Sequence, residues 1–322
     1  MARRCLVIHP GALGDVLLAL PALAHLAVLF PGAARVLATA PRLGALLHGS
    51  ACVEETADVD ALGLHPLFVA DPDPEALARF GGYHAIVSWL GAGDPAYCAH
   101  LARLGCPVVV AGATPAPGSR THAARHLLDT IAPLGPVPGT PRPVRLGVGD
   151  DERRWARAWL EGRGLRPGEA VVLHPGAGSP AKVWPGFGAL ARRLRATGQP
   201  VVVVAGPADS VPVAQAIEGG GLADTVVARD WPLRRLAALL EAARAFVGND
   251  SGLSHLAAAV GCQSLVLFGP TDPVVWTPLG ERVVVLAGSA SGARDPWREL
   301  TPDRVEDALA VRLGRARPAL AG

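Results

Sequence analysis

The sequence Leu6-Val7-Ile8-His9-Pro10-Gly11-Ala12 returns almost unchanged as Val171-Val172-Leu173-His174-Pro175-Gly176-Ala177. Each copy is a short apolar run followed by a turn with proline and glycine, which is typical of a buried strand and the turn that leaves it. Each copy also stands where a domain would begin. The repeat therefore predicts two similar domains, each with this motif as its first strand and first turn.

Other short apolar runs alternate with segments of helical length and period along the whole chain. Apolar runs of this kind suit parallel strands that helices cover on both faces. The alternation predicts an α/β, doubly wound architecture. The predicted strands are 5–8, 35–38, 85–89, 108–111, 171–173, 201–205, 225–228, 245–247, 265–268 and 283–286, and the helical segments include 16–29, 152–161, 188–196 and 233–244.

A stretch rich in proline and glycine, residues 133–143, has no periodicity and is typical of a linker between domains. The 322 residues are enough for two domains of ordinary size. We therefore expect an N-terminal domain at 1–140 and a C-terminal domain at 141–322, and the last helix is free in principle to pack back on the first domain.

Composition excludes several classes of protein. Half of the residues are apolar and the net charge is +2, so the chain is globular and gives no general reason to bind nucleic acid. The five cysteines show no zinc-site spacing and predict reduced thiols in a cytosolic protein. No apolar run reaches the ~18 residues of a membrane span. We expect a cytoplasmic protein with at most peripheral contact with a membrane.

Lys182 is the single lysine among 30 basic residues, and it lies in a glycine-rich turn after the second copy of the repeat. Such a turn exposes backbone N–H groups to an anion, and an ammonium acts on phosphate as a compact point charge. Two interpretations remain open from the residues alone. Either the lysine binds a phosphate, or one surface lysine has survived by chance.

Asp15 follows Gly11-Ala12-Leu13-Gly14 and stands where the first helix should begin. An aspartate there is a favoured N-cap, which stabilises a helix by about 1 kcal/mol. The same carboxylate could instead accept a proton from a hydroxyl group. The spacing does not choose between the two roles.

The segment from Phe246 to Gly261 predicts a strand end, a cap at Asp250 and a helix that starts at Ser251-Gly252. The N–H groups at the helix start and His255, one turn later, would form an anion site. A capped helix with a polar face is the plainer alternative. A hydrolase is also conceivable, although the G-x-S-x-G nucleophile motif is absent. The Asp71-Pro72-Asp73 sequence is interpreted as a turn and not as a metal site.

Three of these stretches together resemble the heptosyltransferase family, the family 9 glycosyltransferases that elongate the inner core of lipopolysaccharide. The resemblance rests on Gly14-Asp15 with the apolar helix after it, on 174–185 with its Lys-x-Trp-Pro, and on 248–261 followed by Gly269-Pro270-Thr271-Asp272-Pro273. Residues 35–130 contribute little to it.

The resemblance implies two Rossmann-like domains of the GT-B type that face each other across a cleft, an inverting transfer, and neither a metal nor another cofactor. It matches Asp15 to the catalytic base and Lys182 to the lysine on the donor diphosphate. It places Asp209 at the nucleoside and Trp231 at the adenine pocket. The donor-side residues that it implies are Ser179, Lys182, Asp209, Trp231, Asp250, Ser251, Gly252 and His255, and the acceptor-side residues are Gly14, Arg120 and Arg125.

The implied partners are an ADP-sugar donor, such as ADP-heptose, and a glycan or glycolipid acceptor, without nucleic acid. The N-terminal half has no basic excess, and Arg120, Arg125, Arg142 and Arg145 are its only local basic cluster. Two kinds of acceptor therefore stay open, the lipopolysaccharide inner core and another glycan or glycoside without the anionic, Kdo-bearing lipid. The alternatives are a catalytically silent nucleotide-sugar-binding protein of the same fold and, less favoured, a nucleotide-sugar hydrolase.

Overall fold

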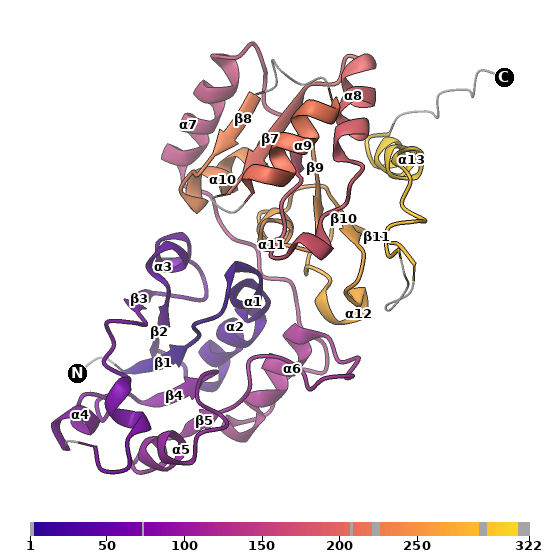
Figure 1. Ribbon diagram of the computed structural model, residues 1–322. Helices are drawn as coiled ribbons and strands as arrows, with labels where there is room; N and C mark the ends of the chain where they lie inside the picture. Colours follow the sequence, from indigo (N-terminus) through magenta and orange to yellow (C-terminus); the bar gives the residue numbers. More distant parts are fainter. Residues whose placement is uncertain (1–2, 73, 207–208, 221–225, 290–294, 315–322) are drawn as a thin grey trace. The chain divides into compact units, whose positions relative to one another are not determined.

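The computed structural model describes residues 3–72, 74–206, 209–220, 226–289 and 295–314 (Figure 1). The chain divides into two compact units, Met1–Leu146 and Gly147–Gly322. The division falls shortly after the proline- and glycine-rich stretch 133–143. Each unit has its own sheet and its own core.

The first unit is built on a five-stranded parallel sheet in the order β3-β2-β1-β4-β5. The chain moves from β1 to one edge and then returns to the other side of β1, so the topological switch lies between β1 and β4. The strands are β1 (Arg4–Ile8), β2 (Ala34–Thr39), β3 (Glu55–Asp58), β4 (Ala85–Ser88) and β5 (Val108–Val110).

The helical segment predicted at 16–29 is two helices instead of one. Pro21 lies in the first turn of the second helix, and a proline ring there cannot continue the hydrogen bonding of the turn before it. The chain therefore breaks at Ala19. The helices of this unit are α1 (Leu13–Leu18), α2 (Leu20–Leu29), α3 (Pro41–Leu47), α4 (Pro74–Ala78), α5 (Pro95–Ala102) and α6 (Ala123–Thr130), with 3-10 turns η1 (His65–Phe68) and η2 (Ala132–Leu134).

The second unit has a six-stranded parallel sheet in the order β11-β10-β9-β6-β7-β8. This is the order of a doubly wound dinucleotide-binding fold, with the switch between β6 and β9. The strands are β6 (Val171–His174), β7 (Val201–Ala205), β8 (Val226–Arg229), β9 (Ala245–Asn249), β10 (Ser264–Phe268) and β11 (Val283–Ala287).

The last helix of the second unit, α13, packs on α8 of the same unit. The sequence had left open a return of this helix to the first domain. The helices are α7 (Asp150–Glu161), α8 (Phe187–Ala196), α9 (Ser210–Gly220), α10 (Leu233–Glu241), α11 (Gly252–Ala259), α12 (Pro273–Trp276) and α13 (Pro302–Arg312), with a 3-10 turn η3 (Pro180–Lys182).

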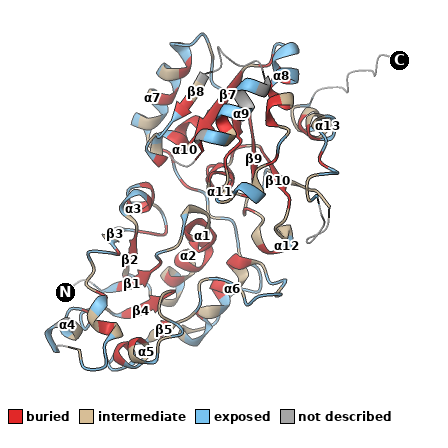
Figure 2. Cartoon of the chain, viewed as in Figure 1, coloured by how far each residue is buried: buried red, intermediate tan, exposed pale blue. Residues whose placement is uncertain are grey.

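All ten predicted strands correspond to strands of the structure, except that Thr225 lies outside the described residues. Figure 2 shows why their apolar runs were recognisable, because the central strands of both sheets are buried along their length. The strand that the sequence did not reveal, β3, is a short edge strand with an exposed residue at each end.

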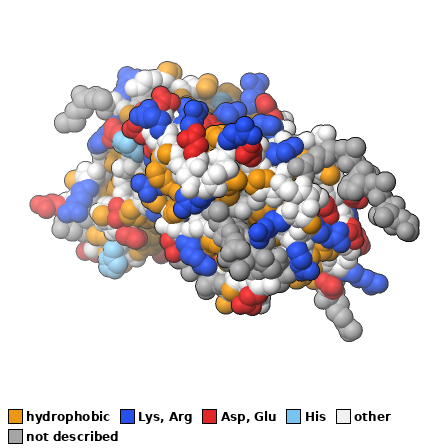
Figure 3. Space-filling model, turned by 90° about the horizontal axis from the view of Figure 1, so that it is seen from above, with side chains coloured by type: hydrophobic (Ala, Val, Ile, Leu, Met, Phe, Trp, Pro, Cys, Tyr) orange, Lys and Arg blue, Asp and Glu red, His pale blue; other side chains and the backbone are white. Residues whose placement is uncertain are grey.

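The surface carries both signs of charge. On the face drawn in Figure 3, basic and acidic side chains are interspersed and do not gather into one patch of a single sign. Within the part of the chain that was searched, no helix is long and apolar enough to cross a membrane. The five cysteines are free thiols, and Cys5, Cys52 and Cys262 are buried.

Candidate functional site

The carboxyl ends of β6 and β9 lie side by side at the switch point of the second sheet. His174, the last residue of β6, is in register with Gly248 of β9. In open α/β sheets, ligands bind beyond the carboxyl ends of the strands at this point. The glycine-rich turn with Lys182 leaves β6, and the segment Asp250-Ser251-Gly252 leaves β9. The fold therefore brings together two of the three stretches that the sequence selected.

Asn249 fastens the glycine-rich turn to β9. Its fully buried side chain donates from Nδ2 to the carbonyl oxygens of Pro175 at 2.9 Å and Gly176 at 3.1 Å. Its Oδ1 accepts the N–H of Trp184 at 3.1 Å. Trp184 is itself buried, and its indole N–H donates to the carbonyl oxygen of Leu300 at 2.8 Å. The turn that carries Lys182 is therefore held at both ends.

Lys182 pairs with a buried carboxylate. Its Nζ lies 2.7 Å from Oδ2 of Asp250, and Oγ1 of Thr271 donates to the same oxygen at 2.8 Å. The Lys182 side chain is 31% exposed and the Asp250 side chain 7%. An ammonium has three hydrogens, of which the bond to Asp250 takes one. The pair fixes the position of a half-exposed cation that still has donors for an oxyanion.

The cap of α11 differs from the prediction. Ser251, and not Asp250, is the N-cap residue, and the helix begins at Gly252. Asp250 lies one residue before the N-cap, and its carboxylate binds Lys182 and Thr271 instead. His255 is buried one turn into the helix.

A second group of polar side chains adjoins the first. Nδ1 of His174 lies 3.2 Å from Oγ of Ser251, and its Nε2 lies 2.9 Å from Oδ2 of Asp209. The N–H of Gly206 donates to the same Asp209 oxygen at 2.7 Å. A Cβ atom at Gly176 would overlap the Asp209 carboxylate, which explains the glycine there.

Burial alone would raise the pKa of Asp209. The hydrogen bonds from His174 and from the Gly206 N–H oppose this effect, and the pKa of Asp209 lies below its usual range. Asp209 is therefore an ionised acceptor in this group. In serine hydrolases Nε2 faces the serine and Nδ1 the aspartate, whereas His174 has these roles reversed. In the alternative hydrolase set of Asp250, Ser251 and His255, the Asp250 carboxylate binds Lys182 and the Ser251 hydroxyl bonds to His174.

In the first unit, Asp15 is the third residue of α1 and not its N-cap. The helix begins at Leu13, after Ala12, and Oδ2 of Asp15 accepts the N–H of Ala12 at 3.1 Å. The carboxylate is half-buried. It stabilises the first turn of α1 from inside the helix, and Gly14 precedes it in the same turn.

His9 supports the turn that leads to Asp15. Its Nδ1 accepts the N–H of Gly11 at 3.1 Å, and its ring meets the edge of Trp89 with centroids 5.2 Å apart. A Cβ atom at Gly11 would clash with the His9 ring, so only glycine fits that close approach. Nε2 is buried without a hydrogen-bond partner among the residues that the structure describes. Burial lowers the pKa of His9 to about 4, so the ring is neutral.

Trp231 packs in a group of aromatic rings. It follows the edge strand β8 and lies edge-on to Trp155 and Trp159 of α7, with centroids 4.8 Å away in both cases. The guanidinium group of Arg163 lies over the Trp159 ring, and that of Arg235 lies over the Trp155 ring. These contacts are those of a packing cluster on α7.

Three predicted residues remain, Ser179 in the second unit and Arg120 and Arg125 in the first. Ser179 is half-buried, directly before η3. Arg120 is exposed in the segment before α6. Arg125 of α6 forms an ion pair with Asp129 and donates to the carbonyl oxygen of Pro138 at 2.6 Å, so its guanidinium joins its own helix to the stretch after it.

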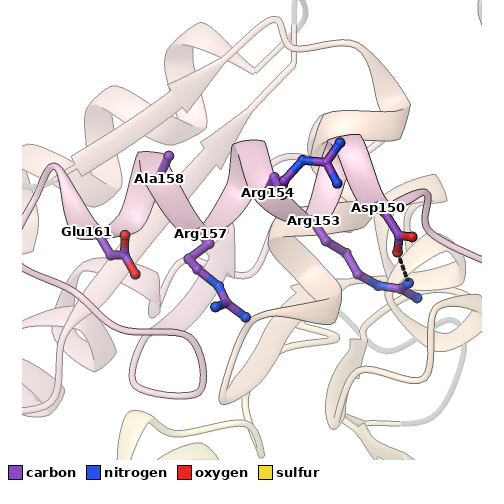
Figure 4. Close-up of a pocket in the computed structure, with 6 residues that line it drawn as sticks. All are labelled: Asp150, Arg153, Arg154, Arg157, Ala158 and Glu161. Carbon is purple, nitrogen blue, oxygen red and sulfur yellow. Dashed lines mark hydrogen bonds and ion pairs between the residues drawn. The ribbon is translucent and has the colours of Figure 1, made fainter.

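The structure also shows a pocket along one face of α7, lined by Asp150, Arg153, Arg154, Arg157, Ala158 and Glu161 (Figure 4). Its charges are already paired in part, since Arg153 binds Asp150 at 3.1 Å and Glu241 at 2.7 Å. It shares no residue with the groups described above. Among the described residues, no cluster of histidine, cysteine or carboxylate side chains could hold a metal ion.

Sequence reasoning assigned no role to His174, Asn249 or Thr271. The repeated His-Pro-Gly-Ala motif was a signal for His174, since it placed a buried imidazole at the carboxyl end of the first strand. Asn249 ends β9 directly before Asp250. Nothing in the sequence around Thr271 indicates its bond to Asp250.

Comparison with known proteins agrees with this fold. The family described as Glycosyltransferase family 9 (heptosyltransferase) matches residues 137–298, about half of the chain. Lipopolysaccharide heptosyltransferase 3 of Escherichia coli K12 is 30% identical over 174 residues, which are 52% of this chain and 50% of that protein. The chain therefore spans about half the length of this curated relative.

Two solved structures share the fold over nearly the whole chain. The family 9 glycosyl transferase from Veillonella parvula DSM 2008 matches with a TM-score of 0.78 at 18% identity and covers 97% of each chain. The Escherichia coli heptosyltransferase WaaC with ADP matches with a TM-score of 0.66 at 22% identity, over 96% of this chain and 99% of that one. Two α/β domains in one chain, each with a parallel sheet, are thus the GT-B type of fold that the sequence predicted. By its sequence and its fold, this chain belongs to glycosyltransferase family 9, the heptosyltransferases.

Proposed function

We propose that this protein transfers a heptose from ADP-heptose to a hydroxyl group of an acceptor, with inversion at the reacting sugar carbon. The observation that carries the proposal is the Lys182–Asp250 pair beside Ser251, at the switch point where a doubly wound sheet binds nucleotides. Membership of the family supports sugar transfer. The bound ADP named for the similar WaaC structure supports an adenine nucleotide.

The donor half of the reaction falls to the second unit. Cleavage of the bond between sugar and diphosphate leaves negative charge on a phosphate oxygen. In the proposed complex, the Lys182 ammonium and the N–H groups at the start of α11 stabilise that charge. Because Asp250, which accepts a hydrogen bond from Thr271, fixes the ammonium in advance, little reorganisation accompanies the reaction. We propose that this cationic set acts without a metal ion.

The acceptor half falls to Asp15. Its carboxylate accepts the proton of the acceptor hydroxyl as the new bond to the sugar forms. The bond from the Ala12 N–H fixes one oxygen of the carboxylate, Oδ2. His9 and Gly11 fix the turn before it. The group is thus oriented by its own backbone.

The acceptor is proposed to be a glycan or glycolipid. The curated relative is named for lipopolysaccharide, and that substrate class is a candidate here. The first unit has no basic excess, and Arg125 is engaged by Asp129 and Pro138. Of its predicted acceptor-side arginines, Arg120 is the exposed one. We propose a cytoplasmic enzyme with at most peripheral contact with the membrane, and no nucleic-acid partner.

A screen of purified protein against nucleotides and nucleotide sugars by thermal unfolding tests the donor. A ligand at 100 times its dissociation constant stabilises the folded state by about 2.7 kcal/mol, so binding is easily detected. We expect ADP and ADP-sugars to stabilise the protein more than UDP or GDP compounds do. A clear preference for UDP compounds would overturn the donor.

A product assay with ADP-heptose tests the reaction itself. We expect heptosyl transfer to a glycan acceptor in EDTA, at the same rate as with added Mg²⁺. Loss of transfer in EDTA and recovery with Mg²⁺ or Mn²⁺ would contradict the metal-free proposal. Release of free heptose without acceptor, at the rate of transfer, would identify a hydrolase. Donor binding without any turnover over a panel of acceptors would identify a silent binding protein.

A further inference from the structure

Three polar side chains from three elements form a continuous chain of hydrogen bonds beside the proposed donor site. Asp209 follows β7, His174 ends β6, and Ser251 caps α11. The bonds measure 2.9 Å from Asp209 to His174 and 3.2 Å from His174 to Ser251. His174 is 4% exposed and Asp209 7%. The half-buried Ser251 is the member of the chain nearest to solvent.

The chemistry of the two ends fixes the direction of these bonds. Oδ2 of Asp209 also accepts the Gly206 N–H, and an ionised carboxylate can only accept. Nε2 of His174 therefore carries a hydrogen and donates it to Asp209. In the neutral imidazole Nδ1 is then an acceptor, and the Ser251 hydroxyl donates to it. In this state Ser251 turns only lone pairs towards a ligand, which suits a phosphate oxygen poorly.

We propose that His174, held by Asp209, is a positioning residue that controls the Ser251 hydroxyl, and that binding of a diphosphate at Ser251 brings one proton onto His174. A proton from solvent joins Nδ1, which then donates to Ser251 Oγ. The serine hydrogen turns to a phosphate oxygen. No covalent bond forms or breaks apart from the transfer of this proton. The inference rests on the proposed function, because it takes the Lys182 group as the diphosphate site.

The ionisable groups near His174 already have partners of their own, and we take His174 as the group that accepts the proton. Asp209 after β7 holds its Nε2. Asp250, after β9, is engaged by Lys182 of η3 and by Thr271. His255 on α11 is the other imidazole of the site and the rival for proton uptake, and it serves below as the control.

The same geometry gives Asp209 a different role from the nucleoside contact that the family resemblance implied. Its carboxylate lies against Gly176 and is bound by His174 and Gly206. It acts on the donor through His174 instead of touching the ribose. A side chain that is 10% exposed and accepts two hydrogen bonds is suited to fixing an imidazole.

The tautomer of His174 in the ligand-free protein tests the chain of bonds independently of any donor. Imidazole ¹⁵N spectra, assigned by comparison with His174→Asn, should show His174 as the Nε2–H tautomer at pH 8. The Nδ1–H tautomer would overturn the inference. Failure of every ADP compound to bind would contradict the proposed function, and the tautomer would still decide whether the hydrogen-bonded chain exists.

Calorimetric titration with ADP-glucose tests the proton. Its diphosphate has no group that titrates near neutral pH, so proton uptake measured from buffers of different ionisation enthalpy belongs to the protein. We expect net proton uptake on binding at pH 8, and affinity that falls as the pH rises. Uptake should vanish in His174→Asn and Ser251→Ala, and persist in Ser251→Thr and His255→Asn. Equal uptake in all four variants, or none in the native protein, would overturn the inference.

The role of Asp209 has its own readout. Asp209→Asn should reduce proton uptake, and it should leave the ratio of the affinities for ADP and 2′-deoxy-ADP as in the native protein. If the Asp209 carboxylate contacted the ribose, Asp209→Asn would instead abolish the difference in affinity between ADP and 2′-deoxy-ADP. That result would assign Asp209 to the nucleoside.

Discussion

His9 and His174 stand at the same place in the two units, at the carboxyl end of the first strand, within the same His-Pro-Gly-Ala sequence. His174 uses both ring nitrogens on polar side chains, Ser251 and Asp209. His9 uses one nitrogen on the N–H of Gly11, packs its ring against Trp89, and leaves Nε2 without a partner in the described structure.

The difference shows that one local motif can serve two purposes. In the first unit the imidazole is a neutral, buried support for the turn before Asp15. In the second unit it is the middle of a polar chain that reaches the proposed donor site. The strand and turn have nearly the same sequence, and the neighbouring side chains decide what the histidine does. They are Trp89 after β4 in the first unit, and Asp209 after β7 and Ser251 at the start of α11 in the second. The predictions below test whether chemistry and donor binding divide between the units in this way.

The largest effect is expected at Asp15. Asp15→Asn keeps an acceptor for the Ala12 N–H but removes the base, so transfer should fall at least ~100-fold while ADP affinity stays unchanged. Steady-state transfer and ADP titration measure the two quantities. Asp94→Asn is the matched control, since Asp94 also accepts a backbone N–H three residues away, from Tyr97. Transfer by Asp15→Asn at the native rate would remove the proposed base.

The second prediction concerns the pH dependence of stability at His9. Its pKa is about 4 in the folded protein and about 6.5 when unfolded, so below pH 6.5 the unfolded chain binds the extra proton. Stability is therefore lost as pH falls, by about 3 kcal/mol once pH 4 is reached. Denaturant unfolding of the native protein and of His9→Leu should show this slope only in the former. Parallel curves would mean that His9 is not a buried neutral group.

The third prediction concerns Lys182. Lys182→Ala should weaken ADP by about 30-fold and leave adenosine almost unaffected, because a charge-assisted bond to phosphate contributes about 2 kcal/mol. Lys182→Arg should also be impaired, since the planar guanidinium cannot take the place of the ammonium beside Asp250. Adding Asp250→Asn to Lys182→Ala should recover part of the ADP affinity by removing an unpaired carboxylate. Equal losses for ADP and adenosine would show that Lys182 acts on the turn and not on phosphate.

The smallest effect is expected at Arg125. Its ion pair with Asp129 is partly exposed to solvent, so Arg125→Ala should lower the free energy of unfolding by at most about 1 kcal/mol. Because the guanidinium is engaged within the first unit, the KM for acceptor should change less than threefold. Arg120→Ala is the comparison variant for acceptor kinetics. A tenfold rise in KM for Arg125→Ala alone would place Arg125 in the acceptor site.

Sequence reasoning found the features of this protein that short-range patterns encode. Buried parallel strands are continuous apolar runs, so they were visible, whereas β3 has the composition Glu-Thr-Ala-Asp and was not. Neither Asp250, which was expected to cap a helix, nor Asp15, for which a cap was one of two open roles, is an N-cap residue. Asp15 lies inside the first turn because its helix already begins at Leu13. The Asp250 carboxylate binds Lys182, which is 68 residues away in the chain.

Long-range partners were the part that the sequence could not show. Asp209 lies 35 residues from His174, and Ser251 lies 77 residues from it, so no spacing rule connects the three. Trp231 was expected at the adenine pocket from family resemblance, and its ring contacts are with residues of α7 more than 70 positions earlier in the chain. The acceptor specificity, the role of each donor-side residue and the metal-free reaction stay predictions.

The place of Trp89 has an optical consequence. Six of the seven tryptophans lie in the second unit, and Trp89 is the one in the first. Its indole meets the His9 ring at 5.2 Å, and a protonated imidazole quenches the fluorescence of a neighbouring indole. Protonation of His9 should therefore lower the emission of Trp89, and a variant that lacks Trp89 should lack this change while the six indoles of the second unit remain.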